Sequence, residues 1–288
     1  MSALNYLRYE LVRGWARVTL NQPDKHNALS IDLLSELADV LWEADEDREV
    51  HAVLIRGAGS SFSSGYDLTP PRKKKERIRP DARSFRGYRS MDDDIWRMEA
   101  SQRALMTVFD MHKPVVAQVH GNCIAGGLDL ALLCDIVIAA DDAVIGFPPV
   151  RKMGTPPQNM WLWNISVQWA KRLLLTGDVL SGSDAAKLGL VLESWPSAEL
   201  EGACESLMDR MSLIDADILT ASKRSLNLSM ELMGARTMQR LALELDGRGH
   251  RSAGATEFGR EMRDQGIKEA LKSRDEGFGD GRAHVRNR

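Results

Sequence analysis

The feature that most constrains the fold is a strand-like apolar run joined to a helix-like one through two glycines. The strand-like run is 115–119, the pair is Gly126-Gly127, and the second run continues to Cys134. Because glycine has no side chain, glycines at a strand-to-helix turn leave the first amide N–H groups of the helix unshielded. These N–H groups also have no partner within the helix. Such amides suit a partial negative charge. Asp129 falls in the same turn, where the helix dipole favours an ionised carboxylate. The alternative is an ordinary glycine-rich turn.

The composition is that of a globular chain. Of 288 residues, 43% are hydrophobic and 27% charged, and the net charge of -3 gives no support to a nucleic-acid or membrane-surface binder. The N-terminal residues lack a basic segment followed by an apolar core, so we expect a cytoplasmic protein without a membrane span. Cys123, Cys134 and Cys204 show no Cys-x-x-Cys spacing, which favours buried thiols over disulfides or a metal site.

Apolar runs of strand length alternate with helical spacing over the first two thirds of the chain. We expect a hairpin around Arg13-Gly14 and a helix capped by Ser30. Further strands are expected at 52–55, 115–119, 136–140, 143–147 and 189–192, and helices at 95–111, from 126, at 160–170, at 171–175 and from 183. This alternation predicts an α/β fold with parallel strands and ligand sites at their carboxyl ends. After Trp195, we expect only helices, at 198–211, 219–233, 235–245 and 256–274. The predicted domains are therefore 1–195 and 196–288.

A second loop of small residues follows the strand expected at 52–55. It runs from Gly57 to Gly65 and continues into Tyr66-Asp67, whereas a phosphate-binding P-loop needs Lys and then Ser or Thr after its last glycine. The loop is therefore no Walker motif. It exposes backbone amides near Gly65 and Tyr66, which makes it a possible second donor site. A surface turn is the alternative.

The segment from Thr69 to Asp94 has few apolar residues, and a mobile loop or a loose helix is expected there. It carries a basic run over 72–77 and three consecutive aspartates at 92–94. A basic run beside a ligand pocket can meet phosphate groups, although such runs are more often solvated.

Several of these pieces, in this order, resemble the crotonase superfamily, that is, the enoyl-CoA hydratase and isomerase family. The resemblance extends from about Tyr6 to Phe278. The matching segments are 19–23 with 27–29, 62–68, 113–121, 125–131, 175–178, 185–186 and 189–191. The resemblance implies a spiral of β-β-α units followed by a C-terminal α-helical trimerisation region that also forms a lid over the CoA site. A homotrimer or a dimer of trimers is the implied assembly.

The resemblance also gives the two loops a chemical role. In the family, two backbone amides hold the thioester oxygen of an acyl-CoA, and the matching amides here belong to Tyr66 and Gly126. Two preorganised donors lower the barrier to a thioester enolate by about 3 kcal/mol each in comparable oxyanion holes. The residues that match the walls of the CoA cleft are Lys25, His26, Asn27, Ser64, Tyr66, Asp67 and Leu68. No cofactor and no metal are implied beyond CoA as part of the substrate.

The catalytic carboxylates depart from the hydratase pattern. One family Glu corresponds to Asp129, which is one methylene shorter, and the other corresponds to Pro149 or Val150. Neither of these two residues transfers a proton, and losing one acid–base partner typically costs about two to four orders of magnitude in rate. The candidates to replace it are Arg151, Asn159, Asp67, Asp94 and His120. Of these, Arg151 and Asp94 are most simply solvated, His120 packed or hydrogen-bonded, and Asp67 a brace for its own loop.

Three functions are compatible with this sequence. The first is hydration or isomerisation of an enoyl-CoA in fatty-acid or related acyl-CoA metabolism, with Tyr66, Gly126 and Asp129 as the catalytic groups. The second is other CoA-thioester chemistry in the same pocket, such as thioester hydrolysis, decarboxylation or retro-aldol cleavage by a lyase. The third is an acyl-CoA-binding protein without catalysis.

Overall fold

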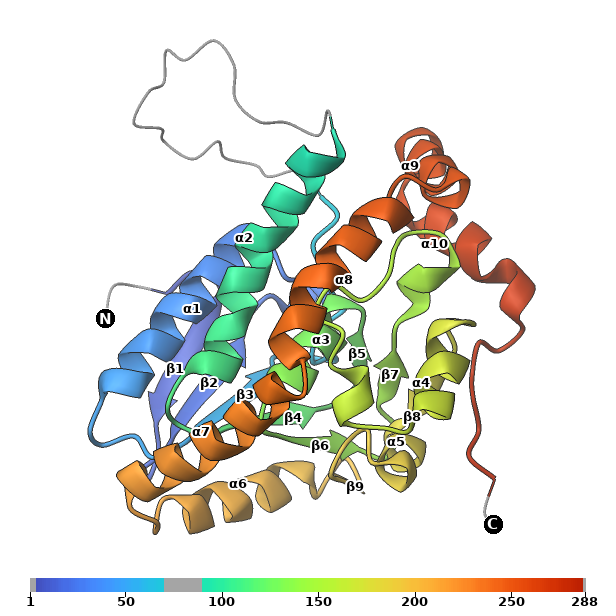
Figure 1. Cartoon of the computed structure of the whole chain (residues 1–288). Coiled ribbons are helices and arrows are strands. Elements are labelled where there is room, and N and C mark those ends of the chain that lie inside the picture. Colours follow the sequence, from blue (N-terminus) through green and yellow to red (C-terminus); the bar gives the residue numbers. More distant parts are fainter. Residues whose placement is uncertain (1–3, 70–89, 287–288) are drawn as a thin grey trace.

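The larger of two sheets has six strands in the computed structural model, which describes residues 4–69 and 90–286 (Figure 1). Its strand order is β1-β2-β3-β4-β6-β9. The strands are β1 (Leu7–Leu11), β2 (Ala16–Leu20), β3 (Val53–Gly57), β4 (Val115–Val119), β6 (Ile136–Ala140) and β9 (Glu193–Trp195). β1 and β2 form the expected antiparallel hairpin, and all the other pairs are parallel. The predicted parallel α/β core is confirmed.

A second sheet stands beside the first and gives the fold its spiral. Its strands are β5 (Asn122–Ile124), β7 (Val144–Gly146) and β8 (Val179–Ser181), in the order β5-β7-β8. β4 of the large sheet leads into β5 of the small one and then into α3 (Gly126–Leu133), and β6 leads in the same way into β7. The repeated β-β-α unit matches the fold class predicted from the sequence.

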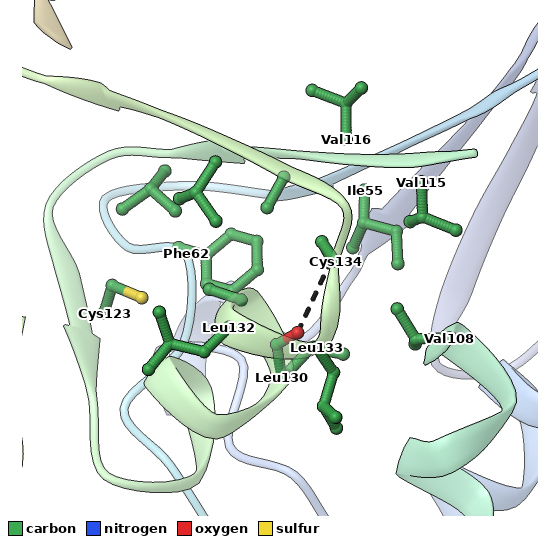
Figure 2. Close-up of a cluster of buried hydrophobic side chains, with 14 of the residues drawn as sticks. Ile55, Phe62, Val108, Val115, Val116, Cys123, Leu130, Leu132, Leu133 and Cys134 are labelled. Carbon is green, nitrogen blue, oxygen red and sulfur yellow. Dashed lines mark hydrogen bonds between the residues drawn. The ribbon is translucent and has the colours of Figure 1, made fainter. Parts of the chain in front are cut away.

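The core lies between the large sheet and the helices that cover it. All eight residues of α3 are buried, and Figure 2 shows Leu130, Leu132 and Leu133 among strand side chains. The Cys134 thiol donates to the Leu130 carbonyl at 3.4 Å. All three cysteines are free and buried, as expected. α3 therefore has no solvent-facing side, and its first turn is held rigidly.

Long helices cover one face of this core. Helices α1 (Ile31–Glu46) and α2 (Met91–Asp110) lie side by side. Ser30 caps α1 by accepting from Leu33 N at 3.1 Å, as its sequence predicts, and Ser90 caps α2 in the same way. Two shorter helices, α4 (Val167–Leu174) and α5 (Gly182–Leu188), accompany the small sheet.

The chain after Trp195 is helical, as predicted. It forms α6 (Leu200–Met211), α7 (Ala216–Leu232), α8 (Ala235–Gly249), α9 (Ala253–Gln265) and α10 (Ile267–Asp275). α6 adds Leu200, Cys204 and Met208 to the main core. α8 packs against α2 and crosses the front of the view in Figure 1. The helical region thus packs directly on the strand-rich part.

Three expected elements differ from the structure. The helix expected at 256–274 is split at Gly266, whose positive φ of 87° suits glycine and separates α9 from α10. The strand expected at 189–192 lies at Glu193–Trp195, because Gly189 ends α5 in a left-handed conformation and Leu190 and Val191 pack inward. The helix expected at 160–170 is a short 3-10 turn over Trp161–Trp163, and α4 starts only at Val167 behind its cap, Ser166.

The sequence analysis missed β5 and β8, which are three residues each. The segment 70–89, which contains the basic run, lies outside the described residues. Within 4–69 and 90–286, no helix combines the length and the apolar composition that crossing a bilayer demands.

A buried lysine links the helical region to the core. Lys223 of α7 is 5% exposed, and its ammonium donates to Val108 O at 3.0 Å and to Lys113 O at 3.1 Å. It also pairs with Asp135 at 2.9 Å. Removing this charge would leave two carbonyl oxygens without their lysine donor and Asp135 without its ion-pair partner.

We therefore expect Lys223→Met to lower the free energy of unfolding by about 2–3 kcal/mol. Lys268→Met, on an exposed helical position, is the matched control and should change it by less than about 0.5 kcal/mol. Chemical denaturation monitored by circular dichroism measures both. An equal effect of the two variants would show that Lys223 does not dock α7.

Candidate active site

The two glycine loops meet, as the sequence analysis predicts. A Cβ added to Gly65 would come within 2.7 Å of Ala125 Cβ and 3.0 Å of Gly126 N, and one added to Gly127 would come within 2.6 Å of Ser63 O. Backbone bonds fix this approach, because Ser63 N donates to Asn122 O at 2.9 Å and Ile124 N to Ser63 O at 3.2 Å. Only residues without side chains allow this contact.

The meeting point presents two amides. Gly126 is the first residue of α3, where a helical N–H has no intrahelical acceptor. Ala125 before it has φ 53° and ψ -128°, a conformation that costs a non-glycine residue about 1–3 kcal/mol. In the described part of the chain, neither Tyr66 N nor Gly126 N donates a hydrogen bond. The pair has the form of an oxyanion hole, and the role of Tyr66 and Gly126 remains a prediction.

The two predicted walls of the CoA cleft lie against one another. Leu29 N donates to Gly65 O at 2.8 Å, and Ser64 N to His26 O at 2.9 Å. Lys25 pairs with Asp67 at 2.8 Å. Although burial acts in the opposite direction, the bonds from Lys25 and Thr69 lower the pKa of Asp67. Asp67 thus braces its own loop, as expected.

Solvent exposure differs among three of the predicted cleft residues, Asn27, His26 and Leu68. The Asn27 side chain is fully buried, and its amide donates to Ala58 O at 2.9 Å and to Ser61 O at 2.7 Å. His26 and Leu68 are exposed at the rim. Asn27 therefore shapes the wall from inside, while contact of the other two with CoA stays a prediction.

A polar cluster lies beneath the two amides. Burial, and then the neighbouring Asp129 carboxyl, raise the pKa of the Tyr66 phenol well above its ordinary value. Burial and the charge of Asp246 likewise raise the pKa of Asp129, which is only 2% exposed. Desolvation in the interior therefore acts against the helix dipole that the sequence analysis expected to keep Asp129 ionised.

Unpaired polar atoms mark the same place. Asp129 Oδ2 and both amide atoms of Gln158 are buried, and none of the three finds a hydrogen-bond partner in 4–69 or 90–286. Gln158 also interacts with the Tyr66 phenol. Buried polar atoms without partners are uncommon in folded proteins, and a catalytic role is one explanation for them.

Sequence analysis missed a second titratable group on this cluster. Asp246 of α8 is 5% exposed, and its Oδ1 accepts from Thr155 N at 2.7 Å. His250, the residue that caps the C-terminus of α8, has its Nε2 3.6 Å from Asp246 Oδ1, and its Nδ1 is bonded to Asp94 of α2 at 2.7 Å. Burial raises the pKa of Asp246 to about 6, and the bond to Asp94 raises that of His250. Their positions, far along the chain from Asp129, gave no local signal.

Three other candidates to replace the missing acid form ion pairs or hydrogen bonds within the fold. Arg151, expected to be solvated, is buried and pairs with Asp275 at 2.9 Å and Asp178 at 3.3 Å. Asp94, also expected to be solvated, is buried against His250 because α2 and α8 pack together. His120 bonds Gly59 O at 3.0 Å, as expected for a hydrogen-bonded histidine. Asn159 lies in a turn with φ 45°.

No group of three or more His, Cys, Asp or Glu side chains with metal-ligand geometry occurs among the residues whose structure is described.

Comparison with known proteins agrees with this geometry. The sequence profile described as enoyl-CoA hydratase/isomerase matches residues 10–258. The hydroxycinnamoyl-CoA hydratase-lyase of Pseudomonas fluorescens is 32% identical over 92% of this chain and 91% of its own. The peroxisomal Delta(3,5)-Delta(2,4)-dienoyl-CoA isomerase of Arabidopsis thaliana is 30% identical over 81% and 86%. A crystal structure of enoyl-CoA hydratase from Mycobacterium smegmatis superimposes with a TM-score of 0.87 at 34% identity, covering 96% of this chain and 95% of that one.

The burial of Asp129 predicts a stability effect. Its folded pKa lies above the ordinary value of about 4, so its contribution to stability is full at low pH and is lost as pH rises. We expect Asp129→Asn to raise the melting temperature at pH 8 by about 2 °C or more, and by less at pH 5.

The matched control is Asp135→Asn, which removes the charge partner of the buried Lys223 and should lower the melting temperature. Thermal unfolding by calorimetry at both pH values measures the two variants. A lower melting temperature for Asp129→Asn at pH 8 would contradict the assignment of a buried, destabilising carboxyl group.

Proposed function

Because the chain belongs to the enoyl-CoA hydratase/isomerase family of the crotonase superfamily, we propose that it hydrates or isomerises the enoyl group of an acyl-CoA. The observation that carries this proposal is the meeting of Gly65-Tyr66 with Gly126. Each of the two meeting loops carries a backbone amide without an acceptor, which suits the thioester oxygen as it becomes an enolate.

The amides stabilise charge on oxygen, and Asp129 moves protons. Asp129 is three residues beyond Gly126 on a fully buried helix, so its distance from the amides is fixed. Burial raises the pKa of its carboxyl, which suits a group that exchanges a proton with carbon. The Tyr66 phenol lies beside it and closes the cluster.

The CoA portion is proposed to lie along the paired segments 25–27 and 64–68. Lys25 is exposed beside Asp67, and the exposed side chain of Leu68 offers an apolar contact at the same rim. These contacts would hold the thioester against the two amides. The required substrate is an acyl-CoA, with no cofactor besides it.

We further propose a homotrimer or a dimer of trimers, assembled through residues 196–288, which also cover the CoA site. Large apolar side chains are exposed along α7 and its flanking turns, where water would otherwise cover them: Leu213, Ile218, Leu226, Leu228, Leu232 and Met233. A cytoplasmic location accords with three free, buried cysteines.

The reaction itself is testable on the purified protein. We expect a panel of short, long and aromatic enoyl-CoAs to include substrates that gain one water or shift their double bond, detected by mass spectrometry of the CoA products. Asp129→Asn should lower kcat/KM by about 10²–10⁴-fold. Asp39→Asn, on the exposed face of α1, is the control and should leave it unchanged.

Unchanged enoyl-CoAs throughout the panel would refute the proposed reaction. Hydrolysis to free CoA, or loss of carbon dioxide, would point instead to other thioester chemistry in the same pocket. Tight binding without turnover, measured by calorimetry, would indicate a non-catalytic acyl-CoA-binding protein.

The amide pair has its own test. A Cβ at Gly126 would come within 2.8 Å of the Tyr66 ring, so Gly126→Ala must displace the residue that supplies the other amide. We expect kcat/KM to fall by about 10²-fold or more. Gly202→Ala on α6 adds the same methyl group where nothing lies within 4 Å and should not change it. Full activity of Gly126→Ala would exclude the oxyanion hole.

A further inference from the structure

An oxyanion hole needs both of its N–H groups directed at the same oxygen. The Tyr66 N–H follows Gly65, whose φ of 96° lies in the left-handed region. Glycine adopts many backbone conformations at similar cost, so Gly65 does not by itself fix the peptide that comes after it. The direction of the Tyr66 N–H must therefore be set by the groups that bond to this turn.

Leu29 holds the peptide group between Gly65 and Tyr66 from the wall of the cleft. The Leu29 N–H donates to Gly65 O at 2.8 Å, and the Leu29 carbonyl accepts from Asp67 N at 3.1 Å, so that Leu29 and Tyr66 form a parallel bridge. A trans peptide places its carbonyl and its N–H on opposite sides. Because Gly65 O is turned towards Leu29, the Tyr66 N–H points away from the segment 27–29.

Ser63 holds the other side of Gly65 with its side chain. Its hydroxyl accepts from Gly65 N at 3.2 Å and donates to Asn27 O at 2.8 Å, and the residue is fully buried. Serine hydroxyls stabilise turns in this way, by bonding the backbone two residues on. One hydroxyl group thus links the Gly65 turn to the wall of the cleft.

The backbone of Ser63 is bonded to the loop that carries the second amide. Ser63 N donates to Asn122 O at 2.9 Å, and Ser63 O accepts from Ile124 N at 3.2 Å. Ile124 ends β5, two residues before Gly126. A Cβ added to Gly127 would lie 2.8 Å from Ser63 Cβ, so the residue also packs on the first turn of α3. Ser63 therefore contacts both halves of the proposed oxyanion hole.

We propose that Ser63 is a positioning residue of the oxyanion hole. Its hydroxyl fixes Gly65 N on one side of the turn, Leu29 fixes Gly65 O on the other, and together they direct the Tyr66 N–H to the oxygen that Gly126 N also binds. The inference rests on the proposed function, because it concerns the same thioester oxygen. Both hydroxyl bonds of Ser63 are internal, so it acts through Tyr66 and not on the substrate.

Loss of this hydroxyl frees one side of Gly65. In the described part of the chain, neither Gly65 N nor Asn27 O has another hydrogen bond. Ser63→Ala leaves both of these backbone groups without their partner, and the glycine is then fixed from one side only. Rotation at Gly65 would turn the Tyr66 N–H away from Gly126 while the side chains along the CoA cleft stay in place. The variant should lose enolate stabilisation rather than CoA binding.

The stretching frequency of the thioester carbonyl measures this alignment. Hydrogen bonds from the two amides weaken the C=O bond, so an isotope-labelled carbonyl of a saturated acyl-CoA should absorb at lower wavenumber when bound than when free. We expect a smaller shift in Ser63→Ala than in wild type, measured by infrared difference spectroscopy at saturating ligand. Ser194→Ala is the control, because it removes a half-buried hydroxyl that donates to Asp141 at 2.6 Å on β9, the far edge of the large sheet. It should keep the wild-type shift.

Steady-state kinetics give an independent readout. With an enoyl-CoA substrate, we expect kcat of Ser63→Ala to fall by about 10–100-fold while KM stays within about threefold. Ser63→Cys keeps a weaker donor and acceptor at the same position, so its carbonyl shift and kcat should lie between those of wild type and Ser63→Ala. Should Ser63→Ala fail to fold, Ser63→Cys decides: a wild-type shift and kcat in that variant overturn the inference.

A wild-type carbonyl shift and kcat in folded Ser63→Ala would overturn the role of Ser63 and leave the proposed function intact. A raised KM or a lower melting temperature with kcat and carbonyl shift unchanged would show a purely structural role and overturn it as well. A wild-type protein that turns over no enoyl-CoA and shifts no carbonyl band would instead refute the proposed function, and the inference with it.

Discussion

The structure depends on the close approach of two backbones, at Gly65 and at Gly126. A side chain at either glycine would collide with the opposite loop. Two sets of hydrogen bonds fix this approach. The amide of the buried Asn27 bonds to the Gly57–Ser61 segment, and β5 bonds to Ser63. The rest of the spiral positions these two loops, since each follows a strand and rests on the same core.

The second constraint is the burial of ionisable groups, which suits catalysis but lowers the stability of the fold. Asp129 and Asp246 are carboxyl groups in the interior, and burial raises the pKa of each. A core built for stability alone would hold apolar side chains there. By contrast, Lys223 is buried with two carbonyl acceptors and Asp135, which is the arrangement expected for a structural charge. The buried carboxyl groups of the site and the fully paired lysine of the scaffold therefore differ in how an ionisable group is buried.

Most of the fold was predictable because the signals that specify it are local. Apolar spacing and the Ser30 cap gave α1, the run 115–119 gave β4, and the glycine pair gave the start of α3. The misses have local causes too. β5 and β8 are three-residue strands stabilised by pairing rather than by their own composition, and Gly266 ends a helix that charge and apolar spacing would have continued.

The site was predictable only where its parts are fixed by neighbours in sequence. The amides of Tyr66 and Gly126 follow from glycine-bearing turns, but the pKa of Asp129 is raised by its burial and then by Asp246, a residue more than a hundred positions away. The family pattern places the second acid at the position of Pro149 or Val150. The chemistry asks only that a second carboxyl group lie beside the first, whichever element carries it. The packing of α8 on α2 buries Asp94 against His250 in the helical region, where sequence spacing gives no sign of the contact.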